Sequence, residues 1–334
     1  MKLLAGIFAV SLLATTAAAY PLSAPTSKPV SPLAHPARPA APSTTAWPQG
    51  LPVYDHVVIV IEENKDYDQI IGAKSAPYIN GTLKKEGANL LKMYAEEHHS
   101  EGNYFWLFSG SNQGVGFGDA IPKHPIAADN LGAALLAAGH TFAGYAEDLP
   151  AVGSTASASG AYARKHVPWL SFSNLPSGTA PAVSSGLRLT DLPSDYSKLP
   201  TVAIVVPNLD HDMHDGSIRD ADRWLQKHID DYYQWAKQHN SLLILTFDES
   251  EHGKKGLTDP AAAAPEDRNR VVTILAGAHI KPGDYELGAG VTHVNLLRTL
   301  EAMYNLEPSG AQQQNAAAAG ITNSTIITGV FTTK

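Results

Sequence analysis

The sequence of 334 residues contains no cysteine. Disulfide bonds, thiolate nucleophiles, cysteine-based zinc sites and a cysteine-linked lipid anchor are therefore excluded. Without cross-links, the folded part of the chain must be stabilised by its hydrophobic core. The chain is long enough to bury a core of that size.

Positive charge is also scarce, because 24 lysines and arginines stand against 32 acidic residues and the formal net charge is −8. Lysines and arginines form no cluster, so we expect no nucleic-acid partner. The only long apolar run lies at the N-terminus, and it is shorter than the roughly 20 residues that span a bilayer. We therefore expect no stable membrane insertion.

The first 50 residues predict two segments outside the folded domain. Residues 1–19 combine Lys2, an apolar run and a small-residue end at Ala17–Ala19, which is the order of a secretory signal peptide. Residues 20–50 are rich in proline, alanine and serine, which predicts a disordered linker. We expect an exported protein, periplasmic or secreted, with one domain over residues 51–334.

Apolar, β-branched runs alternate with helical patterns along that domain. Strands are predicted at 55–62, 88–94, 140–147, 201–208, 241–249 and 271–277, and helices at 75–87, 129–139, 219–239 and 293–306. Residues 150–200 predict long surface loops. The alternation predicts an α/β fold with a central, mainly parallel sheet flanked by helices.

Polar clusters follow the predicted strands, where parallel sheets gather functional residues. Two pairs of hard oxygen donors belong to these clusters: Glu63, Asn64, Asp248 and Glu249. Acids that leave an apolar strand must either reach solvent or share a cation, because burying them unpaired costs several kcal/mol. Solvated strand ends explain one pair alone. Two pairs at one edge favour a divalent metal ion.

The segment NLDHDMHDGS, residues 208–217, holds two histidines among three aspartates. His211 and His214 are three residues apart, so in a turn both side chains can face one site. Histidine there can contact an anionic substrate, protonate a leaving group or bind a metal. The alternative is a solvated turn in which Asp210 or Asp215 caps the next helix. His293, at the start of a predicted helix, is either a further substrate contact or a structural residue.

The segment HHSEGNYFWLFSG, residues 98–110, offers a nucleophile. A helix that begins near Gly102 would present free N–H groups to an anion, with Ser100 just before it and Asn103 facing the same space. A serine needs a base or a metal to become nucleophilic, and no G-x-S-x-G elbow is present. Metal activation therefore suits Ser100 better. The alternative is that Ser100 only caps the helix.

Four blocks in order resemble the phosphoesterase family of bacterial and fungal acid phosphatases and phospholipases C, within the alkaline-phosphatase-like superfamily. They are VVIVIEENKDYDQIIG, HHSEGNYFWLFSGSNQG, VVPNLDHDMHDGSIRDADRWL, and LILTFDES with THVNLLRTLE. The resemblance covers about residues 57–306. It implies an alkaline-phosphatase-like fold and hydrolysis of phosphoric esters.

The resemblance also implies roles for particular residues. The expected metal ligands are Glu63, Asn64, Ser100, Asp248 and Glu249, with Ser100 as the nucleophile. Asn103, His211, His214 and His293 would contact the phosphate, and His214 or His211 would protonate the leaving oxygen. The family usually has proline within this serine motif, S-x-P-N, whereas this sequence has Gly102.

The function implied is a metal-dependent acid phosphatase that hydrolyses phosphate monoesters of small substrates through a phosphoserine. One alternative is a phospholipase C, which would cleave a phosphodiester in a phospholipid. Another is an exported protein that binds metal or phosphate without turnover.

Overall fold

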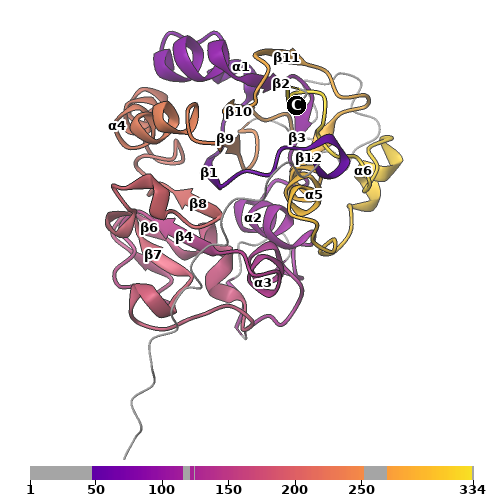
Figure 1. Cartoon of the computed structure of the whole chain (residues 1–334). Helices are drawn as coiled ribbons and strands as arrows, with labels where there is room; N and C mark the ends of the chain where they lie inside the picture. The colour runs from indigo at the N-terminus through magenta and orange to yellow at the C-terminus, as the bar shows by residue number, and fades with distance from the viewer. Residues whose placement is uncertain (1–46, 116–120, 124, 252–268, 333–334) are drawn as a thin grey trace, which may run out of the picture. The chain divides into compact units, whose positions relative to one another are not determined.

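The computed structural model describes residues 47–115, 121–123, 125–251 and 269–332 (Figure 1). The predicted signal peptide and most of the predicted linker lie outside these residues. Within them, Leu51 is fully buried at the predicted start of the domain. The described helices include none long and apolar enough to cross a membrane.

The centre of the domain is an eight-stranded sheet in the order β11-β2-β10-β9-β1-β8-β4-β7. Its strands are β1 (His56–Glu62), β2 (Ala88–Leu90), β4 (Phe142–Ala146), β7 (Gly186–Arg188), β8 (Val202–Val206), β9 (Ser241–Phe247), β10 (Thr273–Gly277) and β11 (Gly283–Tyr285). Two small sheets pair β3 (Met93–Tyr94) with β12 (Val291–Thr292) and β5 (Ala158–Ser159) with β6 (Tyr162–Ala163).

The sheet is mainly parallel, as predicted. The central strand β1 pairs in parallel with β8 and β9, so that Val58 faces Ala203 on one side and Leu243 on the other. Every residue of β1, β8 and β9 is buried. Continuous apolar runs suit such strands because helices cover both faces of the sheet. The exception is β10, which runs antiparallel to β9 and β2.

Helices cover both faces of this sheet (Figure 1). The helix α4 (Ile218–Ala236) and the π-helical segment η2 (Ile79–Lys84) lie on one face, joined where Asp222 accepts hydrogen bonds from the Tyr78 and Ile79 amides. On the other face lie α2 (Ser100–Ser109), α3 (Leu131–Ala137) and α5 (His293–Met303). Short helices complete the described fold: α1 (Tyr67–Ile70), α6 (Gln314–Ala318), η1 (Pro48–Gly50), η4 (Arg164–His166), η5 (Pro168–Ser171), η6 (Pro181–Val183), η7 (Leu189–Asp191) and η8 (Tyr196–Lys198).

Several predicted elements differ in detail. The helix predicted at 75–87 is π-helical over its centre, and the strand predicted at 88–94 is divided into β2 and β3. The helix predicted at 129–139 is α3, and its cap is Asn130, whose side chain accepts from the Ala133 amide. Residues 150–200 are not only loops, because β5, β6 and β7 form there.

Candidate active site

The hydroxyl of Ser100 lies between two carboxylates. Its Oγ donates to Glu63 Oε2 at 2.8 Å and lies 3.2 Å from Glu249 Oε1. Ser100 is the first residue of α2 and is buried, whereas His99 is the cap residue. The helix therefore begins two residues earlier than predicted. The alternative that Ser100 serves only as the cap of the helix is not what the structure has, because His99 occupies that position.

The pairing of β1 with β9 brings these acids together. Glu62 and Phe247 are register partners at the strand ends, so Glu63 and Asp248 leave the sheet side by side. The Asp248 amide donates to the Glu62 carbonyl at 2.9 Å, and the Asn64 amide donates to Asp248 Oδ1 at 3.1 Å. Asn64 has a φ of 49°, a left-handed conformation that asparagine tolerates better than most residues. Four of the predicted metal ligands thus come to one place, with Asn64 joined to it through its backbone.

A second group adjoins the first on the other side of Glu63. His166 Nε2 lies 3.0 Å from Glu63 Oε1, and His166 Nδ1 lies 3.4 Å from Asp212 Oδ2. All three side chains are buried, and one ligand atom of each lies within 4.8 Å of the others. The Tyr104 ring stacks on His166 with centroids 5.0 Å apart. Glu63 therefore directs one carboxylate oxygen to Ser100 and the other to His166.

Burial governs the electrostatics of these acids. Burial, and then the neighbouring Asp248, raises the pKa of Glu63 well above its usual range. Burial and the charge of Glu249 raise the pKa of Asp248 to about 8. Burial raises the pKa of Asp212 to about 7. Buried carboxylates this close cannot all be ionised unless a cation neutralises them.

The donor set fits a divalent ion. Glu63 Oε1, Asp212 Oδ2 and Asp248 Oδ2 are buried and meet no described donor in hydrogen-bond geometry, although the first two lie 3.0 and 3.4 Å from the His166 ring nitrogens. Buried polar atoms of this kind call for a partner, and a cation would supply one to several at once. Carboxylate oxygens with one imidazole suit a hard or borderline ion such as Mg²⁺, Ca²⁺, Mn²⁺ or Zn²⁺.

The two histidines of the segment 208–217 do not share one environment. The His214 ring lies 6.2 Å from the His166 ring between centroids, and Asp215 Oδ1 holds its Nδ1 at 2.7 Å. His211 instead lies against Trp224, with Nδ1 2.9 Å from Glu147 Oε2. The prediction that both face one site is wrong in this respect, because only His214 adjoins the acidic cluster.

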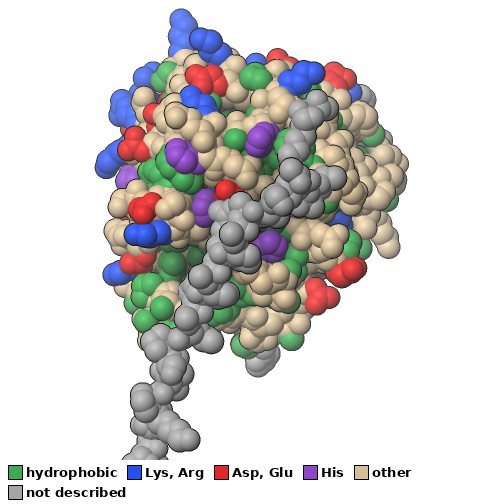
Figure 2. Space-filling model, in the orientation of Figure 1, with side chains coloured by type: hydrophobic (Ala, Val, Ile, Leu, Met, Phe, Trp, Pro, Cys, Tyr) green, Lys and Arg blue, Asp and Glu red, His purple; other side chains and the backbone are tan. Residues whose placement is uncertain are grey.

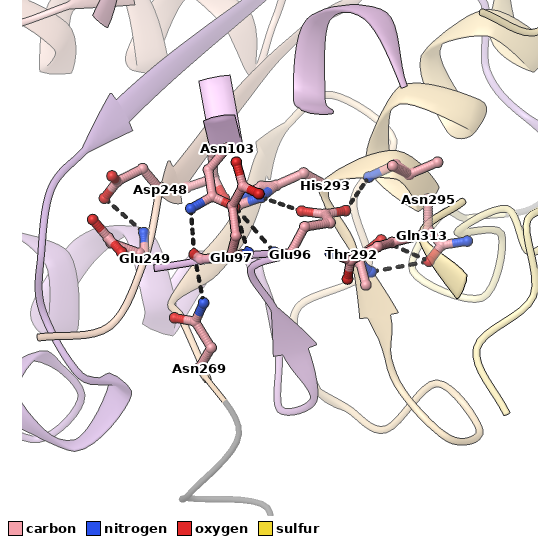
Figure 3. A network of polar contacts seen from close by, with 12 residues as sticks. Glu96, Glu97, Asn103, Asp248, Glu249, Asn269, Thr292, His293, Asn295 and Gln313 are labelled. Atoms are coloured by element: carbon pink, nitrogen blue, oxygen red, sulfur yellow. Dashed lines mark hydrogen bonds and ion pairs between the residues drawn. The ribbon is translucent and has the colours of Figure 1, made fainter. Parts of the chain in front are cut away.

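His293 occupies a structural position rather than a substrate-facing one. Its Nδ1 lies 2.9 Å from Glu96 Oε2 (Figure 3), and its Nε2 lies 2.8 Å from the Phe247 carbonyl. Two acceptors satisfy both nitrogens only when both carry a proton. Burial alone would lower the pKa of His293, but the charge and hydrogen bond of Glu96 outweigh it and raise the pKa. Both ring nitrogens are engaged with the protein, which favours the structural alternative for His293 over a phosphate contact.

The Asn103 side chain also faces the protein. Its Oδ1 accepts from the Glu96 and Glu97 amides at 3.0 and 3.1 Å, and its Nδ2 donates to the Glu97 carbonyl at 2.6 Å (Figure 3). These bonds close the turn that leads into α2 at Ser100. In the structure the amide that was predicted to contact phosphate instead supports the turn that leads to Ser100.

The glycine that replaces the family's usual proline has a packing reason. A Cβ atom at Gly102 would coincide with Oε1 of Glu97, so no larger residue fits while that carboxylate keeps its place. Glu97 is buried, and its Oε2 accepts from Asn112 Nδ2 at 3.2 Å. The departure from the family pattern thus accompanies a buried glutamate packed on the first turn of α2.

Sequence reasoning missed His166 altogether and did not select Asp212. His166 lies in a segment predicted as surface loop, where the available signal was a histidine among aromatic residues in AYARKHVPW. Asp212 is the middle acid of the segment 208–217, from which the sequence analysis selected only the two histidines. Only the fold brings it opposite Glu63, whose amide donates to the Asp212 carbonyl at 2.7 Å.

The arrangement of the sheet and its helices defines the fold of the protein. Solved structures with the same fold include a protein of the alkaline phosphatase superfamily from Vibrio parahaemolyticus, with TM-score 0.51 at 11% identity over 78% of this chain and 68% of the other. The lipoteichoic acid synthase LtaP from Listeria monocytogenes matches with TM-score 0.52 at 9% identity over 78% of this chain and 74% of the other. The fold is that of the alkaline phosphatase superfamily, as predicted.

The family follows from the sequence. The model of the phosphoesterase family matches residues 83–307, and the chain belongs to this family. It is 45% identical over 271 residues to a phosphatidylinositol-3-phosphatase of Mycobacterium tuberculosis, covering 81% of this chain and 84% of the relative. It is 28% identical to a probable acid phosphatase of Kluyveromyces lactis over 81% of this chain and 63% of the relative. The chain is therefore a hydrolase that acts on phosphoric esters.

Proposed function

We propose that the protein is an exported, metal-dependent phosphatase that hydrolyses phosphate monoesters through a phosphoserine at Ser100. The observation that carries this proposal is the Ser100 hydroxyl, held at the start of α2 between the Glu63 and Glu249 carboxylates. A neighbouring carboxylate can accept the serine proton as the hydroxyl attacks, provided that a cation neutralises the surrounding negative charge. The adjoining helix N-terminus favours a phosphate group over a neutral substrate.

The ligands that we propose for the ion are Glu63, Asp248 and Glu249 with the Ser100 oxygen and Asn64. His166 and Asp212 complete the donor set on the far side of Glu63. A divalent ion in this place would lower the pKa of the serine hydroxyl and neutralise phosphate charge. Figure 3 shows how Asp248 and Glu249 lie beside the turn that leads into α2.

The reaction then proceeds in two steps. Ser100 Oγ attacks phosphorus as its proton passes to a neighbouring carboxylate, and the bond from phosphorus to the leaving oxygen breaks. We propose that His214, in its doubly protonated form, protonates that oxygen: Nδ1 donates to Asp215 Oδ1, and the proton on Nε2 is the one passed to the leaving oxygen. Water then attacks the phosphoserine and releases inorganic phosphate.

On the face drawn in Figure 2, histidine side chains gather near the centre while lysines and arginines lie toward the periphery.

The relatives' names favour a monoester over a diester. The relatives include a phosphatidylinositol-3-phosphatase and a probable acid phosphatase, which supports a monoester substrate for this chain. We propose small phosphate monoesters as the general substrate class, with an inositol lipid phosphate as the membrane-derived member to test. Export is supported by the signal-peptide pattern of residues 1–19.

The test compares three substrates on the metal-free and metal-supplemented protein. We expect phosphate release from p-nitrophenyl phosphate and from a short-chain phosphatidylinositol 3-phosphate, restored by a divalent ion after chelation. We expect much slower release of p-nitrophenol from p-nitrophenyl phosphorylcholine. Faster cleavage of that diester would favour a phospholipase C, and metal binding without turnover of any substrate would favour a binding protein. Export is tested by N-terminal sequencing of protein recovered from outside the cytoplasm, which should lack residues 1–19.

A further inference from the structure

The two acids beside Ser100 are held from both ends by buried side chains. Asp248 and Glu249 follow β9 directly, so their positions depend on the peptide groups of Phe247 before them and Ser250 after them. Polar side chains from other elements fix each of these groups. These side chains are His293, which holds the Phe247 carbonyl, and Asn269, which holds the Ser250 amide, and neither belongs to the proposed ligand set.

The first connection reaches the residue before the acidic pair. His293, at the start of α5, has its Nε2 2.8 Å from the Phe247 carbonyl and its Nδ1 2.9 Å from Glu96 Oε2. The other oxygen of Glu96 accepts from the Val294 amide at 3.0 Å. Glu96 and His293 are both fully buried, so the Phe247 carbonyl is held without competition from solvent.

The second connection reaches the residue after the acidic pair. Asn269 Oδ1 accepts from the Ser250 amide at 2.8 Å and from the Ser250 hydroxyl at 3.1 Å. Asn269 Nδ2 donates to the Glu97 carbonyl at 2.8 Å. The Asn269 carbonyl also accepts from the Ala95 amide at 3.0 Å, which fixes this residue to the segment before Glu96.

Both connections end at the turn that carries the nucleophile. Glu96 and Glu97 both donate their amides to Asn103 in the first turn of α2, three residues after Ser100. Figure 3 shows the two sets of bonds meeting around Glu96 and Glu97, with Asn269 on one side and His293 on the other. The turn before Ser100 is therefore tied to both flanks of the acidic pair.

We infer that His293 with Glu96, and Asn269, are positioning residues that set the distance between the Ser100 hydroxyl and the Asp248–Glu249 pair. This inference rests on the proposed roles of Ser100 and the acidic pair. A shift of about 1 Å in a reacting group can lower a rate about 100-fold, and loss of a residue that supports metal ligands typically costs 10- to 100-fold in activity or metal affinity. We expect losses of that size, in kcat more than in KM.

The experiment compares His293→Ala and Asn269→Ala with a control in the same helix. Thr299→Ala removes a buried hydroxyl of α5 that donates to the Asn295 carbonyl and accepts from the Ile327 amide, far along the helix from the site. Each variant is measured for kcat, KM and Mn²⁺ affinity by calorimetry, at a temperature where circular dichroism shows it folded. We expect the two test variants to lose 10- to 100-fold in kcat and to bind Mn²⁺ more weakly, while Thr299→Ala keeps both.

Conservative variants keep the inference testable if a truncation does not fold. In His293→Gln the side-chain amide can still donate to the Phe247 carbonyl, so we expect kcat within about threefold of wild type. In Asn269→Asp the acceptor for Ser250 remains but the donor to Glu97 is lost, so we expect an intermediate kcat. Unchanged kcat and Mn²⁺ affinity in the folded test variants, or losses equal to those of Thr299→Ala, would overturn the inference. Two other outcomes would instead refute the proposed function. One is an active wild-type protein that binds neither Mn²⁺ nor another divalent ion, and the other is a Ser100→Ala variant that keeps the wild-type rate.

Discussion

Metal binding by this site should depend steeply on pH. Carboxylate ligands bind a cation only when they are deprotonated, so the ion must displace any proton that they carry. Burial and the charge of Glu249 raise the pKa of Asp248 to about 8, and burial raises that of Asp212 to about 7. Both acids are therefore largely protonated at pH 6 in the metal-free protein.

The magnitude follows from the larger shift. A ligand with a pKa of about 8 is about 99% protonated at pH 6, so that one proton should weaken the apparent affinity about 100-fold relative to the fully ionised site. The stability of the metal-free protein changes with pH in the opposite direction. The pKa values of these acids in the folded protein exceed the unfolded value of about 4, so their protonated forms favour folding at low pH. That contribution is lost as the pH of the metal-free protein rises toward 8.

Calorimetric titration with Mn²⁺ at pH 6 and pH 8 measures this directly, and thermal unfolding with and without the ion gives an independent measure. We expect at least tenfold tighter binding at pH 8 and a larger rise in Tm there. Asp248→Asn, which cannot titrate at this position, should bind weakly with a shallower pH dependence. Equal affinity at both pH values for the wild-type protein would refute the reasoning, because it would mean that protons on the buried carboxylates do not compete with the ion.

Three further predictions concern the turn that leads into α2 and His214, the proposed proton donor. Gly102→Ala forces the Glu97 side chain from its place, so overpacking should lower the free energy of urea unfolding by about 1–3 kcal/mol and also lower kcat. Adding Glu97→Ala to this variant should restore part of the stability and part of the activity. Full stability and activity in Gly102→Ala alone would contradict the packing argument. Asn103→Asp keeps the acceptor for two backbone amides, so KM should change little; a large rise in KM would indicate direct phosphate contact. His214→Asn should slow hydrolysis of alkyl phosphates more than of p-nitrophenyl phosphate, because only poor leaving groups need the proton; equal loss on both would count against His214 as the acid.

Much of this fold could be predicted because its strands are buried on both faces. The runs around β1, β8 and β9 are continuously apolar, and the polar residues that follow them fall at one edge by the geometry of parallel strands. That reasoning placed Glu63 and Asp248 together correctly. The direction of β10 could not be predicted in this way, because an apolar run has the same composition whichever way it runs.

The roles of individual side chains were less predictable. A histidine in a polar cluster and a histidine in a buried bond network look alike in sequence, which is why His293 was assigned to substrate and His166 was missed. Long-range contacts decide between these environments: Glu96 is 197 residues from His293 in the chain. Asn103 was predicted at the correct turn, but its spacing could not reveal that backbone amides occupy its side chain.

The Ser100→Ala variant tests the central claim most directly. Its turnover of p-nitrophenyl phosphate should be compared with that of Ser109→Ala, which removes a buried hydroxyl of the same helix that donates to the Phe105 carbonyl. The account predicts a loss of at least about 1,000-fold in kcat for Ser100→Ala, since the attacking group is gone, and near-normal kcat for the folded Ser109→Ala. Turnover by Ser100→Ala within tenfold of the wild-type rate would contradict the assignment of Ser100 as the nucleophile.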